Sequence, residues 1–379
     1  MLTTFAVSGY RSLVDVVLPL ESLTVISGAN GTGKSNVYRA LRLLAAAGEG
    51  RTVGAIAHEG GLASVLWAGP ETPRKSGVQG TRRSKPVSVR LGYGSDEFGY
   101  LTDLGLPQVD PARSYFVLDP EIKREQVFTG PFARPSSVII DRTRGAVRVR
   151  DERWRVVDQT LGPAQSLLLD LDDGDSLPEV LRIRHRMSQW RFYDHFRTDR
   201  DAPSRRSQVG TRTRWLSDDG ADLAAVWATT VESGFAGGLD RAVDDAFPGS
   251  SVEIDAQGGI FQLLLHQPGL LRPLRTGELS DGTLRYLLLC AALLPADPPP
   301  LIVINEPESS LHANLIEPLG ALIADAATRT QVIVVTHSKK LRSQLEPLGG
   351  SIELLSQGEG TEVAGQGLLD VPQWHWPSR

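Results

Sequence analysis

The stretch GANGTGKS, from Gly28 to Ser35, constrains the fold of this chain more than any other part of the sequence. It matches the pattern G-x-x-x-x-G-K-[ST] and lies between an apolar run, LTVIS, and an amphipathic segment, NVYRALRLLAAA. The sequence therefore predicts a strand, a phosphate-binding loop (P-loop) and a helix that starts at Lys34. The alternative is a glycine-rich turn that only caps a helix, but the order of the three elements favours phosphate binding.

Each position of this loop suits a nucleotide. Glycines let backbone N–H groups turn toward phosphate oxygens, and the start of the helix adds a favourable dipole. Lys34 supplies a positive charge, and Ser35 offers an oxygen to Mg²⁺. The predicted binding residues are Gly28, Ala29, Asn30, Gly31, Thr32, Gly33, Lys34, Ser35 and Asn36.

Length and composition exclude several other classes of protein. A chain of 379 residues, 41% of them hydrophobic, can bury a substantial core, and its net charge of −5 gives no general argument for binding nucleic acid or membrane. No segment has the apolar length of a membrane helix, and the amino terminus lacks the pattern of a signal peptide. The single cysteine, Cys290, and the scattered histidines suggest neither an intramolecular disulfide nor a zinc site. We expect a globular, cytoplasmic protein with no membrane contact.

Two apolar runs, LIVIN from Leu301 and QVIVV from Gln331, predict buried strands of a parallel sheet. Glu306 follows the first run and His337 follows the second. Ligands of open α/β sheets lie at the carboxyl ends of the strands, so both side chains are expected at the same crevice as the P-loop. Glu306 is the predicted general base for an attacking water, and His337 is predicted to sense or hold the terminal phosphate. For a lone histidine, a structural role is the alternative.

The segment LSDGT, from Leu279 to Thr283, precedes an apolar helix. Ser280 is predicted to cap that helix, whose first N–H groups then form a second anion-binding end. Because the chain has one P-loop, this second end makes sense if it acts on a nucleotide that another subunit holds.

Four motifs, GANGTGKS, LSDGT, INEPESSLH and THS, occur in that order. They resemble the P-loop, the signature, the Walker B motif with D-loop, and the switch histidine of ABC-type ATPases of the SMC and RecF-like branch. The form EPE-x-x-LH most closely resembles small stand-alone AAA-type ATPases related to the OLD family, and we expect neither long coiled-coil arms nor a nuclease domain. The segment GYRSL resembles the start of that branch, which implies that Arg11 lies near the nucleotide.

The resemblance implies ATP and Mg²⁺ as cofactors and a homodimer that sandwiches ATP. In such a dimer, the signature of one subunit contacts the terminal phosphate bound by the P-loop of the other. The residues implied in this contact are Ser280, Gly282, Gly33, Lys34 and Ser35. The implied metal-binding residues are Ser35 and Asn305. The implied catalytic residues are Glu306, His337 and Lys34.

The sequence departs from the family pattern at the metal. Asn305 stands where the family has a carboxylate that helps to hold Mg²⁺. An asparagine oxygen still accepts a hydrogen bond from a metal-bound water, but one negative charge is lost. We therefore predict weak Mg²⁺ binding and slow ATP hydrolysis, and a pure ATP-binding switch is the competing interpretation. In addition, Asp281 replaces the usual second-position glycine of the signature, and Gln79 and Gln126 are candidates for the Q-loop glutamine only by elimination.

Two basic regions, residues 72–90 and 182–214, are candidate DNA contacts. Basic loops neutralise phosphates, and aromatic side chains stack on bases. The second region contains or adjoins the aromatic residues Trp190, Phe192, Tyr193, Phe196 and Trp215. An alternative of equal weight is a helix whose aromatic residues pack inward and whose arginines are simply solvated.

The predicted fold class is α/β, a P-loop NTPase with the two-lobe head of ABC ATPases. Residues 1–165 and 295–379 are predicted to form a split nucleotide-binding lobe, and residues 166–294 a mostly helical lobe with the signature. The runs PVSVRLGYG, SYFVLD, SSVIIDR and AVRVRD predict antiparallel strands of a β subdomain, and SVEIDA with IFQLLLHQ predicts a hairpin. Ser217 and Asp218 are candidate caps of a following apolar helix.

Two functional classes remain. The first is an ATPase that clamps or remodels DNA in repair or defence. The second is an ATP-dependent regulatory dimer that controls a separate effector protein and binds no nucleic acid. A kinase or another small-molecule phosphotransferase is disfavoured because LSDGT and THS would then be coincidental.

Overall fold

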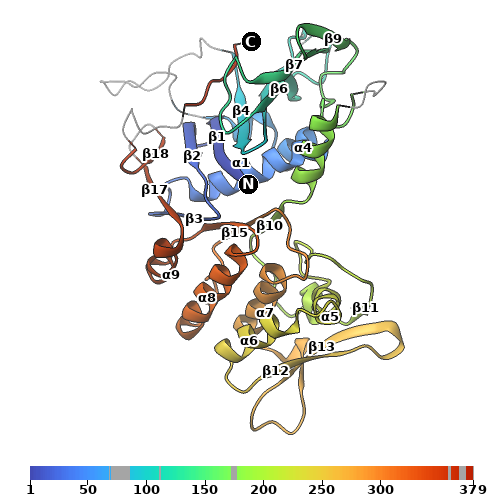
Figure 1. The fold of residues 1–379 in the computed structure, drawn as a ribbon, viewed down its shortest axis with the longest axis vertical. Helices are drawn as coiled ribbons and strands as arrows, with labels where there is room; N and C mark the ends of the chain where they lie inside the picture. The colour runs from blue at the N-terminus through green and yellow to red at the C-terminus, as the bar shows by residue number, and fades with distance from the viewer. Residues whose placement is uncertain are drawn as a thin grey trace. The chain divides into compact units, whose positions relative to one another are not determined.

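The computed structural model describes residues 1–67, 69, 86–110, 112–171, 177–356, 360–366 and 373–378. The chain divides into two compact units (Figure 1). The P-loop unit consists of Met1–Glu21, Ser27–Gln189 and Ile352–Arg379, and the signature unit consists of Ser22–Ile26 and Trp190–Ser351. The division into nucleotide-binding and helical lobes at residues 165 and 294 stays a prediction.

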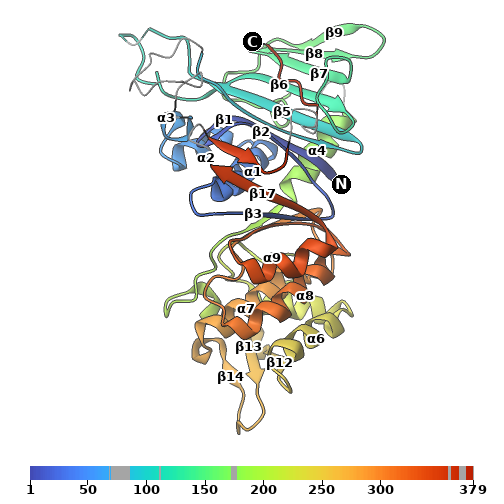
Figure 2. The same ribbon diagram turned by 90° about the vertical axis from the view of Figure 1, so that its left-hand side faces the viewer.

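The P-loop unit contains an antiparallel sheet of eight strands in the order β2-β1-β4-β5-β6-β7-β8-β9. From β4 onward each strand pairs with the next one in sequence, and Figure 2 shows β5 to β9 following one another across the sheet. The strands are β1 (Leu2–Tyr10), β2 (Leu13–Pro19), β4 (Val89–Ser95), β5 (Phe98–Gly105), β6 (Glu121–Thr129), β7 (Val138–Thr143), β8 (Ala146–Arg150) and β9 (Trp154–Asp158).

Three of the four strands expected for the β subdomain are present, because PVSVRLGYG, SSVIIDR and AVRVRD contain β4, β7 and β8. The fourth expectation, SYFVLD, is wrong. Residues 114–119 form turns and bends, and Tyr115 is fully exposed. An apolar run becomes a strand only where a partner strand and a packed face receive it, and this segment has neither among the described residues.

The long helix of the P-loop unit, α1 (Lys34–Gly48), starts at Lys34 as predicted. It buries Val37, Leu41 and Leu44 at helical spacing and packs against α4 (Pro178–Ser188). Two shorter helices follow α1, namely α2 (Thr52–His58) and α3 (Leu62–Val65). A hairpin of β17 (Gly350–Ser356) and β18 (Thr361–Val363) returns the chain to this unit.

Four parallel strands in the order β10-β15-β16-β3 form the sheet of the signature unit. They are β10 (Arg191–Tyr193), β15 (Leu301–Asn305), β16 (Gln331–Val335) and β3 (Leu23–Gly28), whose last residues belong to the P-loop unit. Every residue of β15 and β16 is buried, as in central strands that are covered on both faces. The strands predicted from LIVIN and QVIVV are therefore confirmed.

The helices of the signature unit pack around a core that includes Trp227, Tyr286 and Leu263. Figures 1 and 2 show α6, α7 and α8 side by side, with the predicted hairpin of β12 and β13 next to them. The elements are α5 (Leu223–Glu232), α6 (Ala236–Ala246), α7 (Asp281–Leu293), α8 (Ile316–Ala327), α9 (Lys339–Leu345), β11 (Gln208–Val209), β12 (Ser251–Asp255), β13 (Ile260–His266) and β14 (Leu274–Arg275). Short 3₁₀ turns cover Pro203–Arg205, Gln257–Gly259, Thr276–Glu278, Ala313–Leu315 and Glu346–Leu348.

The predicted caps of α5 are wrong. The helix begins at Leu223, five residues after Asp218. The Asp222 carboxylate instead accepts hydrogen bonds from the backbone N–H of Ser217 (2.9 Å) and from its hydroxyl (2.7 Å). Ser217 and Asp222 therefore close a turn before the helix, which is a common role for serine and aspartate.

Candidate functional site

The P-loop is shaped by glycine conformations and by Lys34. Gly28, Gly31 and Gly33 have φ angles of 151°, 81° and 100°, which side chains rarely adopt. The buried Lys34 ammonium donates hydrogen bonds to the carbonyl oxygens of Gly28 and Ala29, both at 2.8 Å. A positive charge is thus fixed at the start of α1, where an anion is also favoured by the helix end.

Two hydroxyl groups outside the motif support the loop. A Cβ atom on Gly33 would lie 2.2 Å from Thr361 Oγ1 and 2.7 Å from Ser12 Oγ. Thr361 Oγ1 donates to the Thr32 carbonyl at 2.8 Å, and Ser12 Oγ accepts from the Asn36 amide at 2.9 Å. Gly33 is therefore needed both for its conformation and for the space that these hydroxyls occupy. The sequence contained no signal for Ser12 or Thr361.

Arg11 lies in the tight turn between β1 and β2, with φ of 48°. Its guanidinium donates to the Glu59 carboxylate at 2.7 Å, and the Tyr10 hydroxyl donates to the same oxygen at 2.6 Å. Burial opposes the charge of Arg11, but the hydrogen bonds with Glu59 and Tyr10 outweigh it and raise the arginine pKa. A role of Arg11 near a nucleotide stays a prediction.

At the carboxyl ends of the parallel strands, Glu306 and His337 come together. The Nδ1 atom of His337 lies 3.6 Å from Glu306 Oε1 and 3.4 Å from Glu308 Oε1. Both Glu306 and His337 are partly exposed, so solvent reaches them. We call this set the strand-end site; its members are Asp194, His195, Asn305, Glu306, Glu308 and His337, all in the signature unit.

Glu306 has a strained backbone, because its φ of 47° is unusual for a residue with a side chain. Two contacts hold it. Its N–H donates to the Val335 carbonyl at 2.7 Å, and its carbonyl accepts from Arg285 Nη2 at 3.3 Å. The strain places the carboxylate at the turn between the strand and the following segment, where it faces His337.

Glu308 is a residue whose role the sequence did not reveal. Its Oε1 atom accepts hydrogen bonds from the Thr336 hydroxyl at 2.5 Å and from the N–H groups of His337 and Ser338, both at 3.1 Å. The buried carboxylate therefore fixes the backbone that carries the histidine. The available signal was the second glutamate of Glu306-Pro307-Glu308.

Arg285 of α7 lies beside the carboxylates of the strand-end site and is almost fully buried. Burial lowers its pKa, and the charges of Asp194, Glu308 and Glu306 oppose that shift. Its Nη1 atom is 3.0 Å from His195 Nδ1. Because arginine only donates, the Nδ1 atom of His195 accepts this hydrogen bond.

Asn305 has one satisfied and one unsatisfied amide atom. Its Nδ2 donates to Asp194 Oδ1 at 2.8 Å, whereas its buried Oδ1 has no hydrogen-bond partner among the described residues. Among all the described residues, there is no group of three or more His, Cys, Asp or Glu side chains that could hold a metal ion. Mg²⁺ needs no such group, because it keeps several waters and uses one or two protein oxygens with the phosphates of a nucleotide. A free amide oxygen beside a carboxylate fits that requirement.

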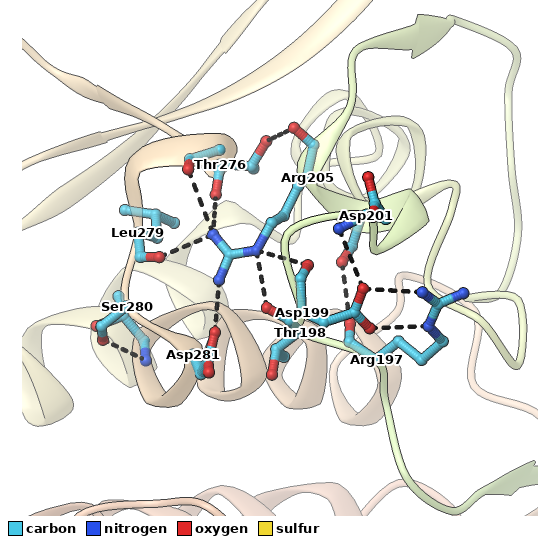
Figure 3. Close-up of polar contacts among 12 residues, drawn as sticks. Arg197, Thr198, Asp199, Asp201, Arg205, Thr276, Leu279, Ser280 and Asp281 are labelled. Atoms are coloured by element: carbon cyan, nitrogen blue, oxygen red, sulfur yellow. Dashed lines mark hydrogen bonds and ion pairs between the residues drawn. The ribbon is translucent and has the colours of Figure 1, made fainter.

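The signature segment is held by Arg205, as Figure 3 shows. Its guanidinium donates to the carbonyl oxygens of Thr276 (3.0 Å) and Leu279 (2.8 Å) and to the Asp281 carboxylate (2.7 Å). Asp281, the departure from the family pattern, thus has a structural partner. The same view shows Ser280, whose Oγ accepts from the backbone N–H of Thr283 at 3.2 Å, so the predicted cap of α7 is confirmed.

Gly282 lies in the first turn of α7, next to the segment that follows Glu306. A Cβ atom on Gly282 would be 3.3 Å from the Ser310 carbonyl oxygen. Ser310 has a φ of 63°, so two left-handed residues, Glu306 and Ser310, occur in this short segment. The contact of Ser280 and Gly282 with a partner's phosphate stays a prediction.

In the second basic region, most of the aromatic residues pack inward, and a contact of its arginines with DNA stays a prediction. Trp190, Phe192, Tyr193 and Phe196 are buried, so their rings cannot stack on bases. The guanidinium groups of Arg191 and Arg214 lie 4.3 and 4.2 Å from the ring centroid of Trp215. Ion pairs with acidic side chains are formed by Arg182, Arg197, Arg205, Arg206, Arg212 and Arg214. The inward packing considered as the alternative describes these aromatic residues.

The first basic region is largely untested, because residues 72–85, including Gln79, lie outside the described residues. Gln126, the other candidate Q-loop glutamine, lies in β6 of the antiparallel sheet and donates to Asp141 at 2.8 Å.

A family model described as "AAA domain, putative AbiEii toxin, Type IV TA system" matches residues 23–343. The chain belongs to this AAA family. No curated protein matches it. Among solved structures, the AAA-family chain is similar to an SMC head bound to the C-winged helix domain of ScpA, with a TM-score of 0.52 at 14% identity over 96% of this chain and 97% of that one. It is also similar to an Smc head domain with an extended coiled coil, bound to the C-terminal domain of ScpA and derived from Pyrococcus furiosus. That match has a TM-score of 0.50 at 12% identity, over 96% of this chain and 95% of that one.

The AAA-family protein thus has the α/β fold of these SMC heads, which is the P-loop NTPase fold that its four motifs predicted. Family membership supports nucleotide binding and hydrolysis. Among the described residues, the helices are all too short or too polar to span a membrane. The roles of individual residues stay predictions.

Proposed function

We propose that this AAA-family protein binds ATP with Mg²⁺, hydrolyses it slowly and forms an ATP-sandwich homodimer. The observation that carries the proposal is the meeting of Glu306 and His337 at the ends of adjacent parallel strands, in a chain that also has a P-loop. Carboxylate and imidazole at this position suit the activation of water and the contact with a terminal phosphate.

Each residue has a proposed task. The loop Gly28–Asn36 binds the phosphates, with Lys34 supplying charge. Ser35 and Asn305 offer oxygens to Mg²⁺, which neutralises phosphate charge when bound. Glu306 orients the attacking water and takes its proton, while Glu308 holds the backbone of His337 in place. Hydrolysis is slow because Asn305 is itself an uncharged amide at the position where the resemblance implies a carboxylate.

Dimerisation is proposed from the signature. Ser280 is exposed at the start of α7, and Arg205 fixes the preceding loop through two carbonyl groups. An exposed, rigid helix start suits the phosphate of a nucleotide held by a second copy. ATP would then favour the dimer because it binds both surfaces at once, and hydrolysis would release it.

The resemblance to the SMC and RecF-like branch favours an action on DNA in repair or defence. The second candidate, an ATP-gated switch for an effector protein, is favoured by a different observation. Leu270 and Leu271, in the turn between β13 and β14, are strongly exposed, and adjacent exposed leucines are typical of protein contacts. Both similar SMC heads are bound to parts of ScpA, another protein.

The test is ATP turnover with Mg²⁺ combined with light scattering on the same samples. Wild-type protein is expected to turn over slowly and to dimerise with ATP, and Lys34→Ala to do neither. Dimerisation without any ATP turnover would support the ATP-gated switch and would contradict the proposed hydrolysis. If ATP neither binds nor changes the mass of the particle, the proposal is wrong.

Partner class is tested separately. If DNA is the partner, wild-type affinity falls steeply with salt, and reversal of charge at Arg82, Arg83 and Lys85 removes most of it. If an effector is the partner, Leu270→Ser with Leu271→Ser weakens its ATP-dependent capture, and DNA affinity stays negligible.

A further inference from the structure

The end of β10 lies beside the end of β15 in the parallel sheet. Tyr193 pairs with Ile304, so the next residues, Asp194 just after β10 and Asn305 at the end of β15, lie side by side. The hydrogen bond from Asn305 Nδ2 to Asp194 Oδ1 joins them across 111 residues of sequence. A carboxylate therefore stands next to the position where the family pattern would have one, but on the neighbouring strand.

The Asp194 carboxylate also determines which way the Asn305 amide faces. An ionised carboxylate only accepts hydrogen bonds, so Asn305 must present its NH₂ group to Asp194. Its carbonyl oxygen then faces the other way. This residue is 9% exposed, and none of the described residues donates to that oxygen. A buried acceptor without a donor is costly, and a metal-bound water would be a suitable donor.

The surrounding charges favour a cation. Glu306 and Glu308 lie in the same strand-end site, and the buried Arg285 interacts electrostatically with all three carboxylates. The Nη1 and Nη2 atoms of Arg285 donate to His195 Nδ1 and to the Glu306 carbonyl. Asp194 itself is exposed, so its second oxygen can reach a ligand from solvent.

We propose that Asp194 supplies the carboxylate that Asn305 lacks, and that the Asp194–Asn305 pair forms the protein side of the Mg²⁺–nucleotide site in this unit. The negative charge is thus displaced by one strand rather than lost. Asn305 keeps two tasks: it orients Asp194 through Nδ2 and accepts from a metal-bound water through Oδ1. This inference rests on the proposed binding of a magnesium nucleotide.

Exchanging the two side chains tests this proposal. The proteins are wild type, Asp194→Asn, the double variant Asp194→Asn with Asn305→Asp, and Asp240→Asn as a matched control on an exposed position of α6. Binding of Mn²⁺ in place of Mg²⁺ is measured by electron paramagnetic resonance, with a non-hydrolysable ATP analogue present. Thermal unfolding without metal is recorded for each protein.

We expect Asp194→Asn to weaken nucleotide-dependent Mn²⁺ binding about 10- to 100-fold, because it removes the only full charge of the pair. The exchanged double variant is expected to recover to within about threefold of wild type, since it again has one carboxylate and one amide. Asp240→Asn is expected to match wild type.

Two failures are distinguishable. If wild type binds Mn²⁺ with the analogue and Asp194→Asn binds it equally well, Asp194 is only a structural partner of Asn305 and the inference is overturned. If wild type shows no nucleotide-dependent Mn²⁺ signal, the proposed function fails and the inference fails with it. Should Asp194→Asn unfold, the double variant decides: folded protein without recovered Mn²⁺ affinity contradicts the proposal.

Discussion

The P-loop and the strand-end site differ in how their shape is produced. The P-loop is a continuous segment, and three glycines with positive φ let its backbone fold around an anion. The strand-end site is assembled at the ends of β10, β15 and β16, and its members are held by contacts such as Asn305–Asp194 and, from α7, Arg285–His195. The shape of the P-loop depends on the absence of side chains at its glycine positions. The shape of the strand-end site depends on the presence of side chains that hydrogen-bond to one another.

The largest expected effect separates chemistry from binding in the strand-end site. Glu306→Gln keeps the size and the shape of the side chain, but an amide cannot act as the base that takes a proton from water. We expect kcat for ATP hydrolysis to fall about 10²- to 10³-fold, with nucleotide affinity nearly unchanged and the ATP-bound dimer accumulating. Turnover assays and light scattering measure both.

The matched control for this change is Glu317→Gln, the same substitution at an exposed position in the first turn of α8. It is expected to leave kcat within about twofold of wild type, a difference worth less than about 0.5 kcal/mol. Equal turnover in Glu306→Gln and in wild type would assign the base to another residue.

The P-loop is tested by two glycine substitutions that differ in space. Gly33→Ala would place Cβ against Thr361 Oγ1 and Ser12 Oγ at a φ of 100°, so we expect a loss of about 3 kcal/mol in the free energy of unfolding. Gly31→Ala has a φ of 81° but no atom within 4 Å of its Cβ, so about 1 kcal/mol is expected. Urea unfolding measures both, and equal losses would mean that Ser12 and Thr361 do not restrict the loop.

The sequence predicted the elements whose information is local. The start of α1 at Lys34, the buried strands β15 and β16 and the cap Ser280 follow from periodicity and from residues a few positions apart. The incorrect strand at SYFVLD had the same local pattern but no partner strand. Local propensity therefore proposes an element, and tertiary pairing decides whether it forms.

The parts of the site that the sequence did not reveal depend on long-range contacts. Thr361 reaches the P-loop across 329 residues, and Asp194 reaches Asn305 across 111. No periodicity or spacing rule connects such positions. The Asn305 departure was visible in the sequence, but its neighbour was not, because only the sheet order β10-β15 brings Asp194 to that edge.

A smaller effect is expected where the strand-end site depends on one carboxylate. Glu308→Ala removes the acceptor of the Thr336 hydroxyl and of the N–H groups of His337 and Ser338, so we expect a loss of about 2 kcal/mol in the free energy of unfolding. Glu308→Gln keeps one acceptor oxygen and should lose about half of that. Chemical denaturation gives the stability, and kcat at saturating ATP shows whether a displaced His337 slows the reaction.

The smallest effect tests whether Asp281, the departure in the signature, has a structural or a functional importance. Its carboxylate meets Arg205 at 2.7 Å, but it is 63% exposed, and such ion pairs contribute little because solvent screens them. We expect Asp281→Asn to cost about 0.5 kcal/mol or less in the free energy of unfolding and to leave ATP-dependent dimerisation within about twofold, since Arg205 still binds the Thr276 and Leu279 carbonyls. A dimer weakened tenfold or more by this substitution, at unchanged stability, would show that the carboxylate itself contacts the partner copy. The signature would then act through a side-chain contact, as the strand-end site does, and not through its backbone alone.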